Sequence, residues 1–152
     1  MLKVGDKAPD FDSKDQDGNQ IQLKDFAGKR VVLWFYPKDD TPGWTIEACS
    51  LRDASDKFDK KSIDVIGVST DNEKSHQKFI SKHNLSMTLI ADTDKKIVED
   101  YGVLVEKSMY GKKYMGIERK TFLIDGDGKI VHIFEKVDVA NHADEVLAAF
   151  GE

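Results

Sequence analysis

The sequence predicts one α/β sandwich domain of 152 residues, with a central mixed sheet, helices on both faces and an N-terminal β-hairpin. Continuous apolar runs alternate with segments of helical periodicity, which is typical of sheets whose strands are buried on both sides. Two strand-like runs then flank an Asp/Gly turn at 125–128, which predicts an antiparallel hairpin beside the earlier strands. The length suits a single domain, spanning 1–152, and the hydrophobic pattern runs through both ends.

The individual elements follow from composition and spacing. The run 31–36 is apolar at every position and 63–69 mostly so, as in buried strands. Ala48, Leu51 and Phe58 recur at helical spacing and predict a helix with one inner face. In order, we expect a strand at 21–23 after the turn at 17–19, a helical turn at 24–27, strands at 31–36, 63–69, 87–91, 120–124 and 129–134, and helices at 44–58, 75–83, 94–101 and 141–150.

The overall composition excludes several classes of protein. A net charge of −5 and a pI near 5.4 argue against nucleic acid or an anionic membrane as partner. No apolar run approaches the ~20 residues of a membrane helix, and the N-terminus lacks a signal-peptide core, so we expect a cytoplasmic protein. One cysteine rules out an internal disulfide framework. His76 and His83, seven residues apart, are a poor metal signal.

The most informative segment is 37–49, where the strand at 31–36 runs through a Pro/Gly turn into a helix. Backbone N–H groups at the start of a helix lack partners, and the helix dipole is positive there. A cysteine at this place has a lowered pKa and reacts as a thiolate. The residue present, Trp44, cannot ionise or attack an electrophile, and it fills space that a small substrate needs.

The spacing of Pro37, Thr41 and position 44 resembles Pro-x-x-x-Thr-x-x-Cys, the active-site motif of peroxiredoxins. Trp44 stands at the peroxidatic cysteine position. The longer run 35–53 resembles the Q-type subfamily, also called bacterioferritin comigratory proteins. Further matches to that subfamily are Gly102-Val103, Tyr110-Gly111-Lys112, Gly116-Ile117, Arg119 and Thr121-Phe122-Leu123-Ile124-Asp125.

The resemblance implies a thioredoxin-like fold and a role for each residue that is retained around position 44. Thr41 would hydrogen-bond the nucleophile and the peroxide, and Arg119 would lower the thiol pKa and polarise the peroxide. Glu47 would orient Arg119. Pro42 would shield the site from water, and Gly43 would bring backbone N–H donors close to the reacting oxygen. Considered alone, each of these residues has an ordinary structural role, and their joint occurrence is what favours the catalytic interpretation.

Cys49 occupies the position of a resolving cysteine in this subfamily. Residues five apart on an intact helix have Cα atoms roughly 8 Å apart, whereas a disulfide needs ~4.4–6.8 Å. With a cysteine at position 44, resolution would therefore require the first turns of the helix to unwind. In the present chain Cys49 has no partner. It is either a small half-buried helical residue or a slow thiol able to form intermolecular disulfides.

The sequence therefore predicts a thiol-peroxidase scaffold for hydrogen peroxide and organic hydroperoxides that is inactive as written, because position 44 holds tryptophan. The resemblance implies recycling by thioredoxin or a similar dithiol, no bound cofactor or metal, and a monomer. Two alternatives remain: a non-enzymatic binding protein or holdase, and a one-cysteine enzyme using Cys49. Whether engineered or natural, Trp44 is expected either to plug the peroxide pocket or to favour local unfolding of its helix.

Overall fold

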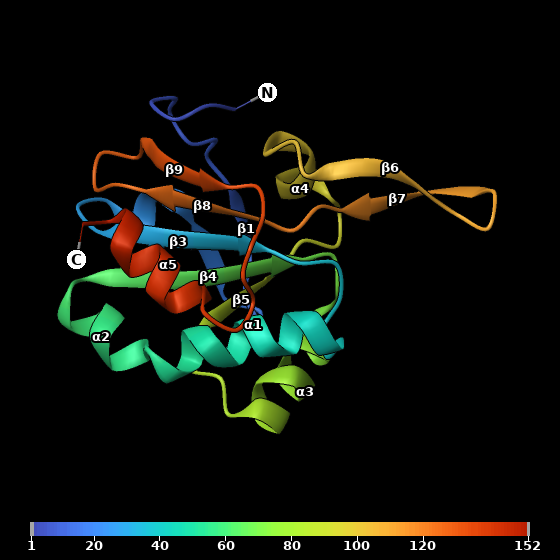
Figure 1. Cartoon of the computed structure of the whole chain (residues 1–152), viewed down its shortest axis with the longest axis horizontal. Coiled ribbons are helices and arrows are strands. Elements are labelled where there is room, and N and C mark those ends of the chain that lie inside the picture. The colour runs from blue at the N-terminus through green and yellow to red at the C-terminus, as the bar shows by residue number, and fades with distance from the viewer. Residues whose placement is uncertain (1, 152) are drawn as a thin grey trace.

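The computed structural model describes residues 2–151 and contains a five-stranded sheet in the order β5-β4-β3-β8-β9 (Figure 1). β4 pairs parallel with β3 and β5, whereas β8 is antiparallel to β3 and β9 is antiparallel to β8. The strands are β3 (Arg30–Phe35), β4 (Ile63–Ser69), β5 (Thr88–Ala91), β8 (Lys120–Ile124) and β9 (Ile130–Phe134). The predicted mixed sheet is confirmed.

The central strand β3 supplies side chains to two hydrophobic cores, one on each face of the sheet. Val31, Leu33 and Phe35 belong to one core, while Val32 and Trp34 belong to the other. Side chains of a strand point alternately to opposite faces, so an uninterrupted apolar run fills both cores. This arrangement explains why the segment is apolar at every position.

Helices cover both faces of this sheet, as predicted. Leu51, Phe58, Phe79 and Val146 from four different helices pack in the same core as Trp34. Ile97, from a fifth helix, packs in the other core with Phe35. The four helices of the first face are α1 (Pro42–Asp53), α2 (Ser55–Lys60), α3 (Glu73–His83) and α5 (His142–Ala149), and α4 (Lys96–Asp100) covers the other face (Figure 1). No helix within residues 2–151 is long and apolar enough to cross a membrane.

The prediction of one helix over 44–58 was wrong at both its start and its middle. Helix α1 begins two residues earlier, with Pro42 at its first position, where the fixed φ of proline suits a helix and its missing N–H costs nothing. The helix is interrupted at Ala54, whose φ of −97° and ψ of 8° lie in the bridge region. A second helix restarts at Ser55 and buries Phe58.

Two hairpins complete the fold. The predicted N-terminal hairpin consists of β1 (Asp12–Lys14) and β2 (Gln20–Gln22), followed by a 3₁₀ turn, η1 (Leu23–Phe26). The hairpin of β6 (Leu104–Met109) and β7 (Lys112–Ile117) was not predicted, and it projects from the body of the molecule (Figure 1). Its two-residue turn places Tyr110 and Gly111 at positive φ, 52° and 78°. The Tyr-Gly pair between two runs of strand length was the available signal.

Candidate active site

The candidate site lies where β3 ends and α1 begins, beside the end of the parallel strand β4. In open α/β sheets the carboxyl ends of parallel strands are the usual place for a ligand. Thr41 is the N-cap residue of α1 and has an extended backbone, with φ −94° and ψ 146°. Its hydroxyl donates to the Lys38 carbonyl at 3.1 Å, so the lone pairs of Thr41 Oγ1 are available as hydrogen-bond acceptors. Gly43 and Trp44 lie in the first helical turn, where N–H groups have no intrahelical acceptor.

The structure brings Trp44 and Arg119 together across 75 positions of sequence. The Arg119 guanidinium carbon lies 4.7 Å from the centre of the Trp44 ring, a cation–π geometry. Trp44 is half-buried and packs against the core that contains Trp34, while Arg119, just after β7, is exposed. Trp44 was expected either to plug the peroxide pocket or to favour local unfolding of its helix, and the helix is folded. Residues 42–50 are helical, and the indole is held between the core and the arginine.

Glu47 points from the next turn of α1 into the protein. It is fully buried, and neither carboxylate oxygen has a hydrogen-bond partner among the described residues. Burial raises the pKa of Glu47 to about 8, and the positive charge of Arg119 offsets part of that rise. Glu47 was expected to orient Arg119, but among residues 2–151 Arg119 has no carboxylate within ion-pair distance. Glu47 is therefore neutral at pH 7 in this structure.

His142, at the start of α5, is the polar side chain that faces Glu47, and no sequence pattern predicted this contact. Its Nε2 lies 3.5 Å from Glu47 Oε2 and 2.9 Å from Thr121 Oγ1. Its Nδ1 lies 3.1 Å from Glu145 Oε1. The ring is fully buried, and desolvation lowers the pKa of His142 despite the opposing effect of Glu145. A neutral imidazole thus faces a neutral carboxylic acid.

A second polar cluster lies under the turn that precedes α1, and it too was missed from sequence. Asp39 is buried there, and its Oδ1 accepts a hydrogen bond of 2.6 Å from the Tyr36 hydroxyl. Its Oδ2 accepts one of 2.8 Å from Ser75 and lies 2.7 Å from His76 Nδ1. His76 Nε2 lies 2.9 Å from the Ile90 carbonyl. Both ring nitrogens of His76 thus lie within hydrogen-bond distance of an oxygen, so the ring is held at both ends.

The same cluster ties the turn to β4 and keeps Tyr36 neutral. The Asp39 N–H donates to Asp71 Oδ2 at 2.7 Å, and the Ser69 hydroxyl donates to that same oxygen at 2.9 Å. Burial raises the pKa of Tyr36 well above its ordinary value, and the adjacent Asp39 carboxylate raises it further. Tyr36 therefore stays a phenol and donates.

Candidate metal ligands occur in this cluster, since oxygens of Asp39 and Asp71 and a ring nitrogen of His76 lie within 4.8 Å of one another. Each of these atoms already has a hydrogen-bond partner inside the protein: Tyr36 and Ser75 donate to Asp39, and Ser69 donates to Asp71. A metal ion would have to displace those donors. The geometry favours a hydrogen-bonded network rather than a metal site.

Cys49 is a free, half-buried thiol in the third turn of α1. It lies on the same intact helix as Trp44, so the separation expected from helical geometry holds. The structure does not bring Cys49 to Thr41 or Arg119 through any hydrogen bond or ion pair of the described residues. Pro37 is half-buried in the turn, and Pro42 is exposed at the helix start.

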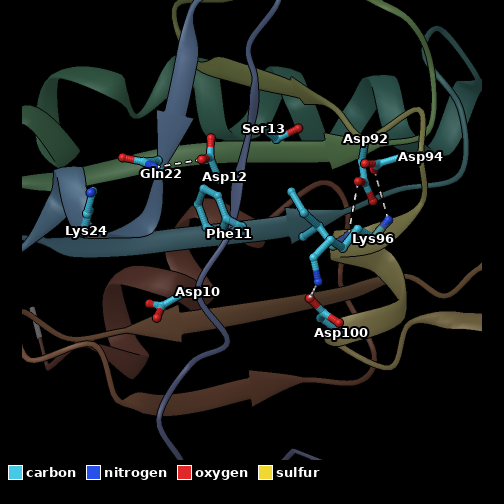
Figure 2. Close-up of a pocket in the computed structure, with 11 residues that line it drawn as sticks. Asp10, Phe11, Asp12, Ser13, Gln22, Lys24, Asp92, Asp94, Lys96 and Asp100 are labelled. Atoms are coloured by element: carbon cyan, nitrogen blue, oxygen red, sulfur yellow. Dashed lines mark hydrogen bonds and ion pairs between the residues drawn. The ribbon is translucent and has the colours of Figure 1, made fainter.

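A separate cavity of about 310 Å³ lies between the N-terminal hairpin and α4, and Figure 2 shows its acidic lining. Several of its carboxylates are engaged within the protein: Gln22 donates to Asp12 at 2.9 Å, and Lys96 pairs with Asp100 at 3.0 Å. Asp92 accepts from the backbone of α4. None of the predicted catalytic residues lines this cavity. The predicted chemistry and this cavity therefore occupy different places.

Comparison with known proteins agrees with this architecture. Residues 4–133 match the AhpC/TSA family. The chain is 50% identical to peroxiredoxin Bcp of Escherichia coli over 146 residues, which cover 96% of this chain and 94% of that protein. It is 45% identical to peroxiredoxin Bcp of Bacillus subtilis, with 96% and 93% covered.

Solved structures agree as well. The bacterioferritin comigratory protein of Xanthomonas campestris, studied for its alkyl peroxide reduction activity, superposes with a TM-score of 0.89 at 40% identity, covering 99% of this chain and 96% of that one. Fold, motif order and sequence identity all point the same way. The chain belongs to the AhpC/TSA family and, within it, to the Bcp or Q-type peroxiredoxins.

Proposed function

We propose that this chain has the scaffold of a thiol peroxidase for hydrogen peroxide and organic hydroperoxides, and that it is inactive as a peroxidase because Trp44 replaces the attacking thiol. The observation that carries this proposal is the stacked pair at the start of α1. Trp44 stands where the family motif has its cysteine, and the Arg119 guanidinium lies over its ring at 4.7 Å. An indole has no ionisable thiol, so no thiolate is available to attack an O–O bond.

The surrounding parts support a peroxidase site once a thiol is restored. The free N–H groups of the first turn and the lone pairs of Thr41 are placed to stabilise negative charge that develops on oxygen. A thiolate at position 44 would attack one peroxide oxygen, break the O–O bond and become a sulfenic acid, while the departing alkoxide takes a proton. Cys49 would then condense with the sulfenic acid and release water. Thioredoxin or a similar dithiol would reduce the resulting disulfide.

The test compares this chain with Trp44→Cys in peroxide-dependent oxidation of reduced thioredoxin. We expect turnover by the variant, abolished again when Cys49→Ala is added, and no turnover by the unmodified chain. Activity of the unmodified chain that disappears in Cys49→Ala would instead establish an enzyme working through Cys49. Absence of activity in Trp44→Cys would refute the scaffold proposal.

A second candidate is a non-enzymatic binding protein, such as a partner of thioredoxin-like proteins or a holdase. The β6–β7 hairpin favours it, because four large apolar side chains are exposed there: Met109, Tyr110, Tyr114 and Met115. Exposed apolar surface of this kind is typical of interaction sites. If Trp44→Cys is inactive while the unmodified chain suppresses aggregation of an unfolded client, this second function is the correct one.

A further inference from the structure

The turn before α1 is fixed to three other elements through one buried residue. Asp39 is bonded to Tyr36 at the end of β3, to Asp71 after β4, and to Ser75 and His76 on α3, at distances of 2.6 to 2.8 Å. His76 is in turn held by a backbone carbonyl of β5. Buried polar networks with every member satisfied are rigid. Asp39 is therefore a fixed point in the chain.

A second fixed point lies further along α1. The Ser50 hydroxyl accepts a hydrogen bond of 3.2 Å from the Ala143 N–H of α5. The Arg52 side chain donates to the His83 carbonyl at the end of α3, at 2.7 Å. Leu51, between them, is buried in the core. The second half of α1 is thus held to two other helices.

The segment 40–49 between these points is held much less firmly. Among the described residues, its side-chain hydrogen bonds to other elements all come from Asp40, which bonds Lys82 and His83 at the surface. Among the described residues, neither the Thr45 hydroxyl nor the Glu47 carboxyl group makes a hydrogen bond, and the polar group facing Glu47 is His142 Nε2 at 3.5 Å. An unsatisfied buried group costs free energy that unwinding returns. Position 44 and Cys49 both fall within this segment.

We propose that Asp39 and His76 are positioning residues for the peroxidatic site, because they fix the upstream end of segment 40–49. The segment can then unwind and refold while the 37–39 turn stays in place, so that Thr41 and position 44 return to the same geometry. The anchoring itself depends only on the contacts described above. Its catalytic consequence rests on the proposed function.

We call the hydrogen-bonded contacts of Asp39 and His76 the anchor. Amide hydrogen exchange of the unmodified chain tests the anchor directly. The Asp39 N–H, bonded to Asp71, should exchange slowly although it lies in a turn. The helical amides of residues 46–49 should exchange faster than it, through local opening. The anchor idea fails if the Asp39 amide exchanges as fast as those of 46–49, or if 46–49 are as protected as the amides of β3.

Variants at the anchor and at a matched surface contact give the second arm. His76→Gln should speed exchange of the Asp39 amide by about tenfold or more, since the buried 2.7 Å contact between the imidazole and the Asp39 carboxyl group is lost. Lys82→Ala removes an exposed contact between the same helix and the same turn, and should leave that amide unchanged. If His76→Gln does not fold, Asp39→Asn serves the same purpose. Equal effects of the anchor variant and Lys82→Ala would overturn the assignment.

A third arm measures catalysis in the Trp44→Cys background. Adding His76→Gln should lower kcat/KM for peroxide about tenfold or more, while adding Lys82→Ala should change it less than twofold. An anchor variant that loses Asp39 amide protection yet keeps full kcat/KM would refute the positioning role. If Trp44→Cys is itself inactive, the proposed function fails, and the exchange measurements still decide on the anchor.

Discussion

Asp39 and Glu47 are both buried carboxylic acids beside the start of α1, and each faces a buried histidine, yet their surroundings differ sharply. Asp39 is contacted by Tyr36, Ser75 and His76 within hydrogen-bond distance, whereas Glu47 has no hydrogen-bond partner among the described residues. The first arrangement stabilises one conformation. The second stores a desolvation cost that any opening of the helix relieves. The same helix start therefore combines a rigid entry with a strained interior.

This difference shows how a site can be both well positioned and able to move. The satisfied network lies just upstream of the helix, and the unsatisfied group lies within its second turn. If the chemistry requires α1 to unwind, the Asp39 network keeps the preceding turn in place, while the unsatisfied Glu47 lowers the cost of unwinding the helix itself. Three experiments can break or sharpen the comparison.

The largest effect is expected at the satisfied network. His76→Ala removes a buried hydrogen-bond partner of Asp39, and losing a contact of this kind to a buried carboxyl group costs about 3 kcal/mol of folding free energy. The free energy of unfolding in urea, measured at pH 7, checks this value. The double variant with Asp39→Asn should lose less than the sum of the two single losses. A loss below about 1 kcal/mol for His76→Ala would contradict the view that the network is rigidly satisfied.

An intermediate effect is expected from Glu47 as the pH rises. Its pKa is raised to about 8 in the folded chain from an ordinary value of 4.5, so the folded state binds the proton more tightly. That contribution to stability is complete below about pH 4.5 and is lost as the pH rises to about 8. His142, whose pKa is lowered, acts in the opposite sense below about pH 6.5.

Between pH 6.5 and 8, ionisation of Glu47 should therefore reduce the unfolding free energy by about 1.6 kcal/mol. Urea denaturation at these two pH values measures the fall, and Glu47→Gln should remove it. Equal slopes for the two proteins would mean that Glu47 is already ionised in the folded chain, and the comparison with Asp39 would no longer hold.

The smallest effect is expected from the stacked pair. Arg119→Ala removes the cation over the Trp44 ring, an exposed contact worth about 0.5–1 kcal/mol. Unfolding in urea measures the loss, and Trp44 emission in a Trp34→Phe background reports the change around the indole. Arg119→Lys should retain part of both signals. Unchanged emission in Arg119→Ala would show that the arginine does not rest on this ring in solution.

The fold could be predicted because it depends on local pattern, whereas the order of the site residues came from the family resemblance. The apolar run of β3 and the Pro42-Gly43 pair are readable within a few residues. The pairing of Glu47 with His142, 95 positions apart, depends on how α5 packs against α1, and no local signal encodes it. The family resemblance predicted that Glu47 orients Arg119. Instead, the exposed guanidinium lies against Trp44, because Glu47 is buried and neutral.

The projecting β6–β7 hairpin is a place where a protease can cleave the chain. Its tip is the most accessible stretch described, with Tyr110 98% exposed, and Lys112 and Lys113 follow directly. Exposed tips are preferred points of proteolytic nicking. Trypsin would there cut the chain into one fragment with Trp44 and Cys49 and another with Arg119, joined through β3 and β8. The candidate active site thus takes residues from both fragments, and mixing separately made fragments is expected to rebuild it.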